Sequence, residues 1–96
     1  MPEFIAEGGD LSKYITTHIH YPYDAKKEGI QGRVICQFIV TETGILIDVQ
    51  VVRGIDPNLD KEAIRMIMNM PRWKPGRQMN QIVKVKYTLP VNFRLQ

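Results

Sequence analysis

The chain has 96 residues, of which 44% are hydrophobic and 24% charged, a composition typical of a small globular domain and not of a disordered chain. No stretch reaches the roughly 18 apolar residues that a membrane-spanning helix needs, and the opening MPEFIAEGGD lacks the cationic and apolar regions of a signal peptide. One cysteine, Cys36, excludes an internal disulfide and a cysteine-based zinc site. The sequence as given therefore predicts a soluble domain.

Charge is unevenly distributed along the chain. All ten acidic residues lie at or before Glu62, together with six of the 13 cations. The remaining cations follow with no acid among them: Arg65, Arg72, Lys74, Arg77, Lys84, Lys86 and Arg94. The last third of the chain is therefore predicted to present a positive surface to a partner.

Two short helices and a strand are predicted before residue 41. Asp10 can cap a helix whose apolar face has five residues at helical spacing: Leu11, Tyr14, Ile15, His18 and Ile19. A further helical turn is predicted from Asp24 to Glu28, closed by Gly29. The period then changes to two, which predicts a strand with four inward side chains: Val34, Cys36, Phe38 and Val40.

A hairpin and the main helix are predicted next. TETG indicates a turn in which Gly44 supplies a positive φ, and the following strand is predicted to point four side chains inward: Ile45, Ile47, Val49 and Val51. Asp56-Pro57 favours a helix start, because aspartate accepts from free amides and proline suits the first helical position. The helix is predicted to end at Pro71 and to bury one face: Leu59, Ala63, Ile67 and Met70, with Ile64 and Met66 at its margins.

Residues 82–95 alternate without interruption, so they predict one long terminal strand. Its inward side chains are predicted to be Val83, Val85, Tyr87, Leu89, Val91 and Phe93. Pro90 cannot donate to a ladder, and Lys84 and Lys86 are outward charges of the kind that sheet edges carry. We therefore predict an edge strand. Such an edge is either protected against unwanted pairing with other chains or serves as a docking site for a peptide strand.

The order helix, strand, strand, helix, strand favours an α+β fold, with helices on one face of an antiparallel sheet. Residues 1–96 are predicted to form a single domain. Within it, residues 1–20 form an N-terminal segment with a short helix, and residues 21–96 form the core.

The sequence PRWKPGRQ, residues 71–78, places the only tryptophan among two prolines, a glycine and three cations. One interpretation is a basic, aromatic recognition loop. The other is a hinge in which Trp73 anchors the core while the flanking cations reach water. We favour the hinge, because Trp73 directly follows an amphipathic helix.

Catalysis and metal binding have little support in the sequence. His18 and His20 are two apart, which places them on different faces of a helix, and no third ligand lies at metal spacing. The acidic pairs Asp60 with Glu62 and Glu42 with Asp48 have sufficient roles in a helix cap or on a solvated strand. We therefore predict a protein that is not an enzyme and uses no cofactor.

Nucleic-acid binding is the stronger rival, since seven unopposed cations with Trp73 and Tyr87 are typical of single-strand binders. Tyr87 and Phe93, however, share the inward parity of the terminal strand. An aromatic side chain cannot both stack on a base and fill the core, so no nucleic-acid partner is predicted.

Nearly end to end, the chain resembles the C-terminal domain of TonB energy transducers, especially the form common in Bacteroidetes-type bacteria. The resemblance rests on five pieces in order: PEF with GG, YPYDAKKEGIQGRV, FIVTETGILIDVQVVRGIDPNLDKEAIR, MPRWKPGRQ and VKVKYTLPVNFRL. It implies a three-stranded antiparallel sheet with two main helices packed on one face. It also implies a periplasmic domain, anchored to the inner membrane through an N-terminal helix and a proline-rich linker that this sequence does not contain.

The resemblance further implies partners and a use. Outer-membrane TonB-dependent transporters carry a short TonB box that adds as a strand to the domain's last strand. ExbB and ExbD act on the transducer through the N-terminal regions, and the pull opens the transporter for siderophores, cobalamin or glycans. A free edge can also pair with itself, so a homodimer formed by strand exchange is a further expected partner.

The partner-binding residues are predicted on the last strand and at one position after the YP motif: Val83, Lys84, Val85, Lys86, Tyr87, Thr88, Leu89, Val91, Asn92, Phe93 and Lys26. Lys26 stands where the enteric form has a glutamine. One alternative remains within the resemblance, since TonB-type modules also end membrane-bound sensor peptidases of the BlaR type. There the domain would bind a partner and transmit a signal without pulling.

Overall fold

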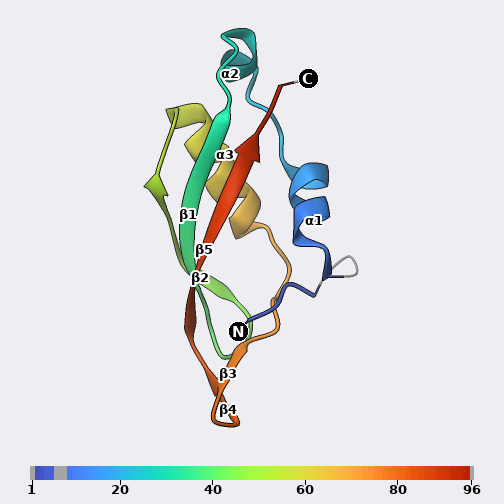
Figure 1. Ribbon diagram of the computed structural model, residues 1–96, viewed down its shortest axis with the longest axis vertical. Coiled ribbons are helices and arrows are strands. Elements are labelled where there is room, and N and C mark those ends of the chain that lie inside the picture. Colours follow the sequence, from blue (N-terminus) through green and yellow to red (C-terminus); the bar gives the residue numbers. More distant parts are fainter. Residues whose placement is uncertain (1, 6–8, 96) are drawn as a thin grey trace.

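The fold is a three-stranded antiparallel sheet with helices packed on one face and a small hairpin at one end (Figure 1). The structure, a computed structural model, describes residues 2–5 and 9–95. The sheet order is β2-β1-β5, which confirms the predicted α+β architecture. The fold is elongated, with principal extents of 49 × 26 × 16 Å.

Two short helices precede the sheet. α1 spans Leu11–His18, and Asp10 caps it by accepting the Lys13 N–H at 3.0 Å, as predicted. All five residues of its predicted apolar face are at least partly buried. α2 spans Tyr23–Lys27 and is followed by Gly29 at φ +69°.

β1, Gly32–Val40, is the central strand, and its four predicted inward side chains are fully buried. The turn that follows contains Gly44 at φ +83°. A Cβ at this position would come within 2.0 Å of the Trp73 carbonyl oxygen. Gly44 is therefore required both by its backbone conformation and by the close approach of the Trp73 backbone, of which the sequence indicated only the first.

β2, Leu46–Arg53, corrects one part of the predicted pattern. Leu46, Val49 and Val51 pack against the core, whereas Ile45 and Ile47 are 45% and 37% exposed. The register with β1 shifts between Gln37 and Ile39, and Asp48 opposite this shift has φ +52°. This β-bulge reverses the alternation within the strand, so strict alternation failed for its first half.

α3, Pro57–Met68, begins as predicted, since the Asp56 carboxylate accepts the N–H groups of Asn58 and Leu59 at 3.0 and 3.4 Å. The helix ends at Met68, and Asn69 occupies the C-cap. Met66, predicted at the margin, is 1% exposed and belongs to the buried face, while Met70 is only partly buried. The apolar face is thus rotated slightly from the prediction.

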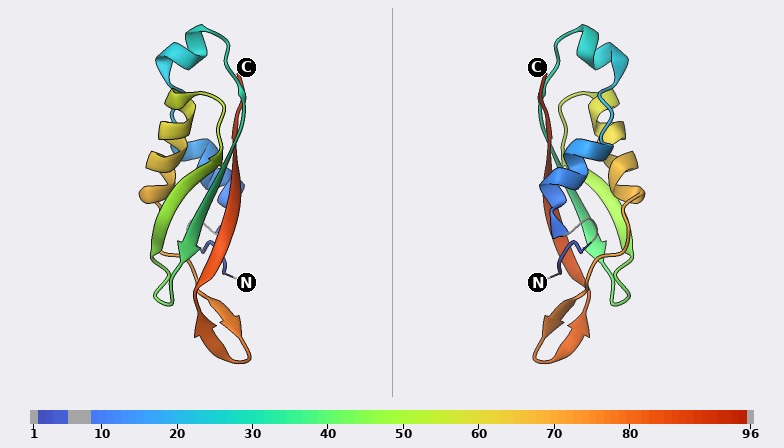
Figure 2. Two further views of the ribbon diagram at one scale, coloured as in Figure 1. Left: turned by 90° about the vertical axis from the view of Figure 1, so that its left-hand side faces the viewer. Right: turned by 90° about the vertical axis from the view of Figure 1, so that its right-hand side faces the viewer.

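The terminal segment is two strands and not one. β3, Gly76–Gln78, pairs with β4, Gln81–Val83, through a turn in which Met79 and Asn80 have φ of +52° and +65°. β5, Val85–Phe93, begins after Lys84 and pairs with β1. Because one intervening residue keeps Val83 and Val85 on the same parity, the alternation could not reveal the break. The hairpin projects beyond the end of the sheet (Figure 2).

The core lies between the sheet and the helices. β1 and β5 contribute Val34, Cys36, Phe38, Val40, Leu89, Val91 and Phe93; the helices contribute Tyr14, Ala25, Leu59, Ala63, Met66 and Ile67. Phe4 and Trp73 complete it from loop segments. The N-terminal segment is therefore packed into the core, and Glu3 forms an antiparallel bridge with Lys74.

Candidate functional site

β5 is an edge strand of the sheet, as predicted from Pro90 and the outward lysines. All nine of its residues pair with β1 in one unshifted register, from Gly32 opposite Phe93 to Val40 opposite Val85. Its other side pairs with no strand of the described chain. A long, regular and unpaired edge can accept a further strand.

The side chains of β5 divide cleanly between the two faces of the sheet. Leu89, Val91 and Phe93 are buried on the helix side. Lys86, Thr88, Pro90 and Asn92 are exposed on the open side. Two cross-strand contacts order this open side: Gln37 Nε2 donates to Thr88 Oγ1 at 3.2 Å, and Arg33 Nε donates to Asn92 Oδ1 at 3.1 Å.

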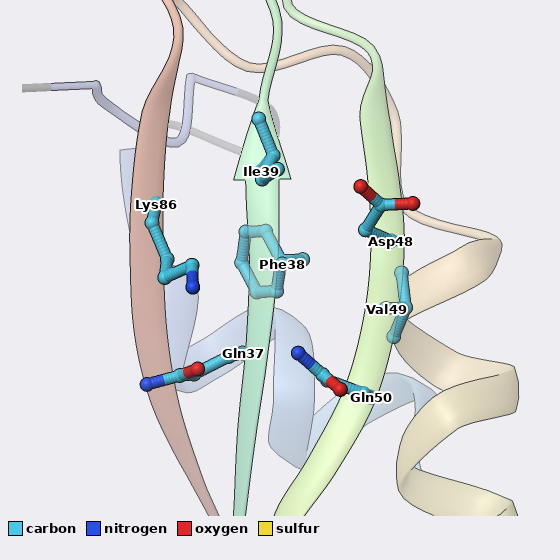
Figure 3. Close-up of a pocket in the computed structure, with 7 residues that line it drawn as sticks. All are labelled: Gln37, Phe38, Ile39, Asp48, Val49, Gln50 and Lys86. Atoms are coloured by element: carbon cyan, nitrogen blue, oxygen red, sulfur yellow. The ribbon is translucent and has the colours of Figure 1, made fainter.

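The open face is hollowed where the β2 bulge lies. Figure 3 shows this hollow with Lys86 on β5, Gln37 on β1, and Asp48 and Gln50 on β2. Its volume is about 310 Å³. These four side chains come from three strands and include no nucleophile, and the apolar residues Phe38, Ile39 and Val49 also line the hollow. The hollow is therefore a mixed polar and apolar surface that lies mainly over β1 and β2 (Figure 3).

A larger groove runs along the carboxyl half of β5, between its edge and α1. Its volume is about 710 Å³. The apolar lining includes Leu11 and Ile15 from α1, Ile19 at its C-cap, and Leu89 and Phe93 from β5. This groove could not be predicted from the sequence, because helical spacing identifies an apolar face on α1 without showing that part of it stays open beside the last strand.

Polar contacts fix the position of α1 against α3. Tyr14 Oη donates to the Asn69 carbonyl oxygen at 3.3 Å, Arg65 Nη2 donates to the His18 carbonyl oxygen at 3.2 Å, and Glu62 Oε2 accepts the His20 N–H at 2.7 Å. Arg65 and Glu62 also form an ion pair at 2.6 Å. Partial burial by itself raises the pKa of Glu62, but hydrogen bonds from Arg65 and the His20 amide outweigh it, so this pKa lies below its ordinary value.

Trp73 is an anchor and not a ligand surface, as favoured from the sequence. Its side chain is 2% exposed and makes edge contacts with Phe4, Phe38 and Tyr87. Its backbone N–H donates to the Gly44 carbonyl oxygen at 2.9 Å. The aromatic partners of the indole thus come from the sheet and the N-terminal segment.

The predicted partner-binding residues fall into four groups. Lys86, Thr88 and Asn92 lie exposed on the edge strand, while Tyr87, Leu89, Val91 and Phe93 share the same strand but face the helices. Val83 pairs with Gly76 in the β3–β4 hairpin, Lys84 joins the hairpin to β5, and Val85 begins β5. Lys26 is exposed on α2, which lies at the end of the molecule where β5 finishes (Figure 1).

Cys36 is a buried thiol on the central strand β1. Burial, with the Asp60 charge nearby, raises the pKa of the Cys36 thiol to about 11, so this group is neutral at physiological pH. No cluster of three His, Cys, Asp or Glu side chains suited to a metal ion occurs in residues 2–5 and 9–95. None of the helices described here is long and apolar enough to cross a membrane.

Trp73 and Tyr87, the two aromatic residues that suggested base stacking, are packed into the fold. Trp73 and Phe93 are buried, and Tyr87 is partly buried and stacks on Phe38 with ring centroids 5.6 Å apart. The cations of the last third are spread over α3, the loop after it, the hairpin and the two ends of β5: Arg65, Arg72, Lys74, Arg77, Lys84, Lys86 and Arg94. Trp73 and Tyr87 are therefore not available as the stacking surface that single-strand binding would need.

Comparison with known proteins agrees with the architecture. The family model described as Gram-negative bacterial TonB protein C-terminal matches residues 17–95. No curated protein sequence matches the chain.

Three solution structures show the same fold. The longer of two Helicobacter pylori TonB C-terminal domain structures has a TM-score of 0.68 at 22% identity, covering 88% of this chain and 77% of that one. The shorter has a TM-score of 0.68 at 24% identity, covering 88% of each chain. The Pseudomonas aeruginosa TonB C-terminal domain has a TM-score of 0.61 at 28% identity, covering 81% of this chain and 79% of that one. With the fold and most of its length matched, the chain belongs to the family of Gram-negative bacterial TonB C-terminal domains.

Proposed function

We propose that the free edge of β5 binds the TonB box of an outer-membrane TonB-dependent transporter by strand addition. The observation that carries the proposal is the nine-residue strand that pairs with β1 without a register shift and leaves its other side open. Main-chain hydrogen bonds then supply most of the affinity, with a modest demand for particular side chains. Family membership supports the choice of partner.

Pro90 indicates which residues of β5 would pair with the incoming strand. In an antiparallel ladder, residues whose N–H and C=O groups point to one neighbour alternate with residues that point away. The ladder with β1 continues through Pro90, which has no N–H, so Pro90 fits the set that points away. Lys86, Thr88 and Asn92 share this parity, and we assign them as the free donors.

The same geometry suits a domain under load. When a strand is pulled along its own direction, the hydrogen bonds to its neighbour are sheared together, so several share the force. The proposed domain acts in the periplasm and is anchored to the inner membrane in the full-length transducer. ExbB and ExbD, driven by the proton gradient, act on the regions outside this sequence, and the pull on the box opens the transporter plug.

A titration of the isotopically labelled domain with synthetic TonB-box peptides tests the proposal. The amide resonances of Lys86, Thr88 and Asn92 should shift first and saturate with one dissociation constant. Shifts confined to Trp73 and the two histidines, with β5 unchanged, would overturn it.

A backbone variant makes the same test independent of side chains. Thr88→Pro removes one predicted donor at the free edge, and the affinity should fall at least about tenfold. Thr88→Val loses the contact with Gln37 but keeps the amide, so it serves as the matched control. An equal loss in both variants would contradict main-chain pairing.

A further inference from the structure

The groove between α1 and β5 lies directly beside the edge at which the proposed strand would add. A strand paired with β5 would point alternate side chains to the helix side of the sheet, because successive side chains of a strand point to opposite faces. On that side the groove is lined by Leu11 and Ile15 of α1, by Ile19 at its C-cap, and by Leu89 and Phe93 of β5. These inward side chains would therefore enter a groove that is mainly apolar, although Ser12, Thr16 and Asn92 also line it.

On the other side of the sheet the same strand would meet polar surroundings. Its outward side chains would lie beside Lys86, Thr88 and Asn92, which are exposed. Among the described residues that line the groove, Arg94 alone is charged, and it lies just after the carboxyl end of β5. The groove thus favours a carboxylate at that end and offers no acidic side chain to a cationic partner.

We infer that α1 is a specificity element, and that the groove selects an extended peptide with apolar residues at every second position and an acidic residue at the end nearest Arg94. The inference rests on the proposed function, since it concerns the same docked strand. Most of α1 precedes residue 17, where the match to the family model begins. The wall that α1 contributes to the groove therefore lies mostly outside that match, whereas Leu89, Phe93 and Arg94 lie within it.

The position of α1 supports this role. Its hydrogen bonds run to α3 through Asn69, Arg65 and Glu62, which leaves the groove between α1 and the β5 edge open. A helix held on one side and open on the other can act as a fixed wall. A docked strand then gains apolar contact without having to move the helix.

Designed peptides of equal composition test the pattern directly. One heptapeptide alternates valine with threonine, and a second groups the same valines and threonines into two blocks. The alternating peptide can place all its valines in the groove in one register, whereas the blocked peptide cannot. We expect the blocked peptide to bind at least about tenfold more weakly to the full 96-residue chain.

Variants on α1 show whether the groove is responsible. Ile15→Ser should reduce affinity for the alternating peptide several-fold and leave the blocked peptide unchanged, and Met68→Ser, an exposed apolar residue on α3, serves as the control. If Ile15→Ser does not fold, Thr16→Trp fills the groove from an exposed position and should have the same effect. An aspartate added to one end of the alternating peptide should strengthen binding at one end only, and Arg94→Gln should abolish that gain.

The outcomes separate this inference from the proposed function. If both heptapeptides shift the amides of Lys86, Thr88 and Asn92 with equal affinity, strand addition stands and selection by α1 is wrong. If neither these peptides nor TonB-box peptides shift β5, the proposed function itself fails. Affinity that depends on alternation but not on Ile15 or Thr16 would also overturn the role of α1.

Discussion

The two edges of the sheet are built differently, although both belong to long strands paired with β1. β5 keeps one register over nine residue pairs, while β2 has two register irregularities and a residue, Asp48, at φ +52°. A bulge twists an edge and interrupts its row of donors and acceptors, which is a common way to prevent unwanted pairing. The difference teaches that one edge of this domain is blunted and the other is left suitable for a partner.

The surroundings of the edges reinforce this contrast. β2 lies beside α3 and exposes separate apolar side chains, among them Val52 at 48%. β5 lies beside a groove and exposes a polar row on its open face. The regular edge, that of β5, therefore also has a groove beside it that could accept side chains of a docked strand.

The largest expected effect comes from the turn that leads into β2. Gly44→Ala would place a Cβ within 2.0 Å of the Trp73 carbonyl oxygen at φ +83°, so we expect a loss of at least about 3 kcal/mol in the free energy of unfolding. Urea denaturation followed by tryptophan fluorescence measures it. Gly29→Ala is the matched control, because Gly29 also has positive φ, +69°, but meets nothing within 4 Å, and it should lose only about 1 kcal/mol. Equal losses would show that the approach of Trp73 is unimportant.

The bulge of β2 provides the second test. Asp48→Val places a β-branched residue at positive φ and should lower the free energy of unfolding by about 1–2 kcal/mol. Asp48→Gly should leave stability unchanged or raise it slightly, since glycine accepts this conformation. Thermal denaturation of both variants distinguishes them. A stable Asp48→Val variant would mean that the irregularity of this edge can relax at little cost.

The third test concerns Pro90, which interrupts the row of backbone N–H donors along the free edge of β5. Pro90→Thr should add a donor at the free edge and strengthen TonB-box peptide binding by about two- to tenfold, the value of one net hydrogen bond. Fluorescence anisotropy of a labelled peptide measures this gain. Pro71→Thr, an exposed proline outside the sheet, should leave the affinity unchanged. Weaker binding by Pro90→Thr would contradict the assignment of Pro90 to the outward set.

The smallest expected effect concerns the contacts that hold α1 against α3. Of the two sheet edges, α1 lies beside that of β5. The pKa of Glu62 is lowered in the folded protein, so its contribution to stability is complete above the ordinary carboxyl pKa and is lost as the pH falls through the lowered value. Between pH 6 and pH 3, the native chain should lose about 0.5–1 kcal/mol more stability than Glu62→Gln. Urea midpoints over this range give the difference. Identical pH profiles would show that the contacts of Glu62 with Arg65 and His20 do not stabilise the fold.

Local rules predicted most of the architecture from the sequence. The caps at Asp10 and Asp56, the positive φ of Gly44 and the inward face of β1 each depend on near neighbours in the chain, and all were confirmed. Pro90 with the two lysines identified the edge strand. These features can be predicted because in each case one residue type is favoured by a local backbone geometry.

The rest depends on contacts between distant segments. The bulge at Asp48 left Ile45 and Ile47 exposed instead of inward. The break between β4 and β5 at Lys84 did not disturb the alternation of side chains, so the sequence pattern gave no sign of it. The groove exists because contacts with α3 hold α1 in place, which no pattern within residues 11–18 expresses. At the candidate site, sequence therefore predicted the strand but not the space beside it.

The buried thiol in the middle of the sheet has a consequence for life in an oxidising compartment such as the proposed periplasm. Cys36 is fully buried on β1, and its raised pKa keeps it as the unreactive thiol. Disulfide-forming catalysts act on accessible thiolates, so two copies of this domain should not become covalently linked through Cys36 while they remain folded. The chain can thus keep an odd cysteine where unpaired thiols are otherwise a hazard.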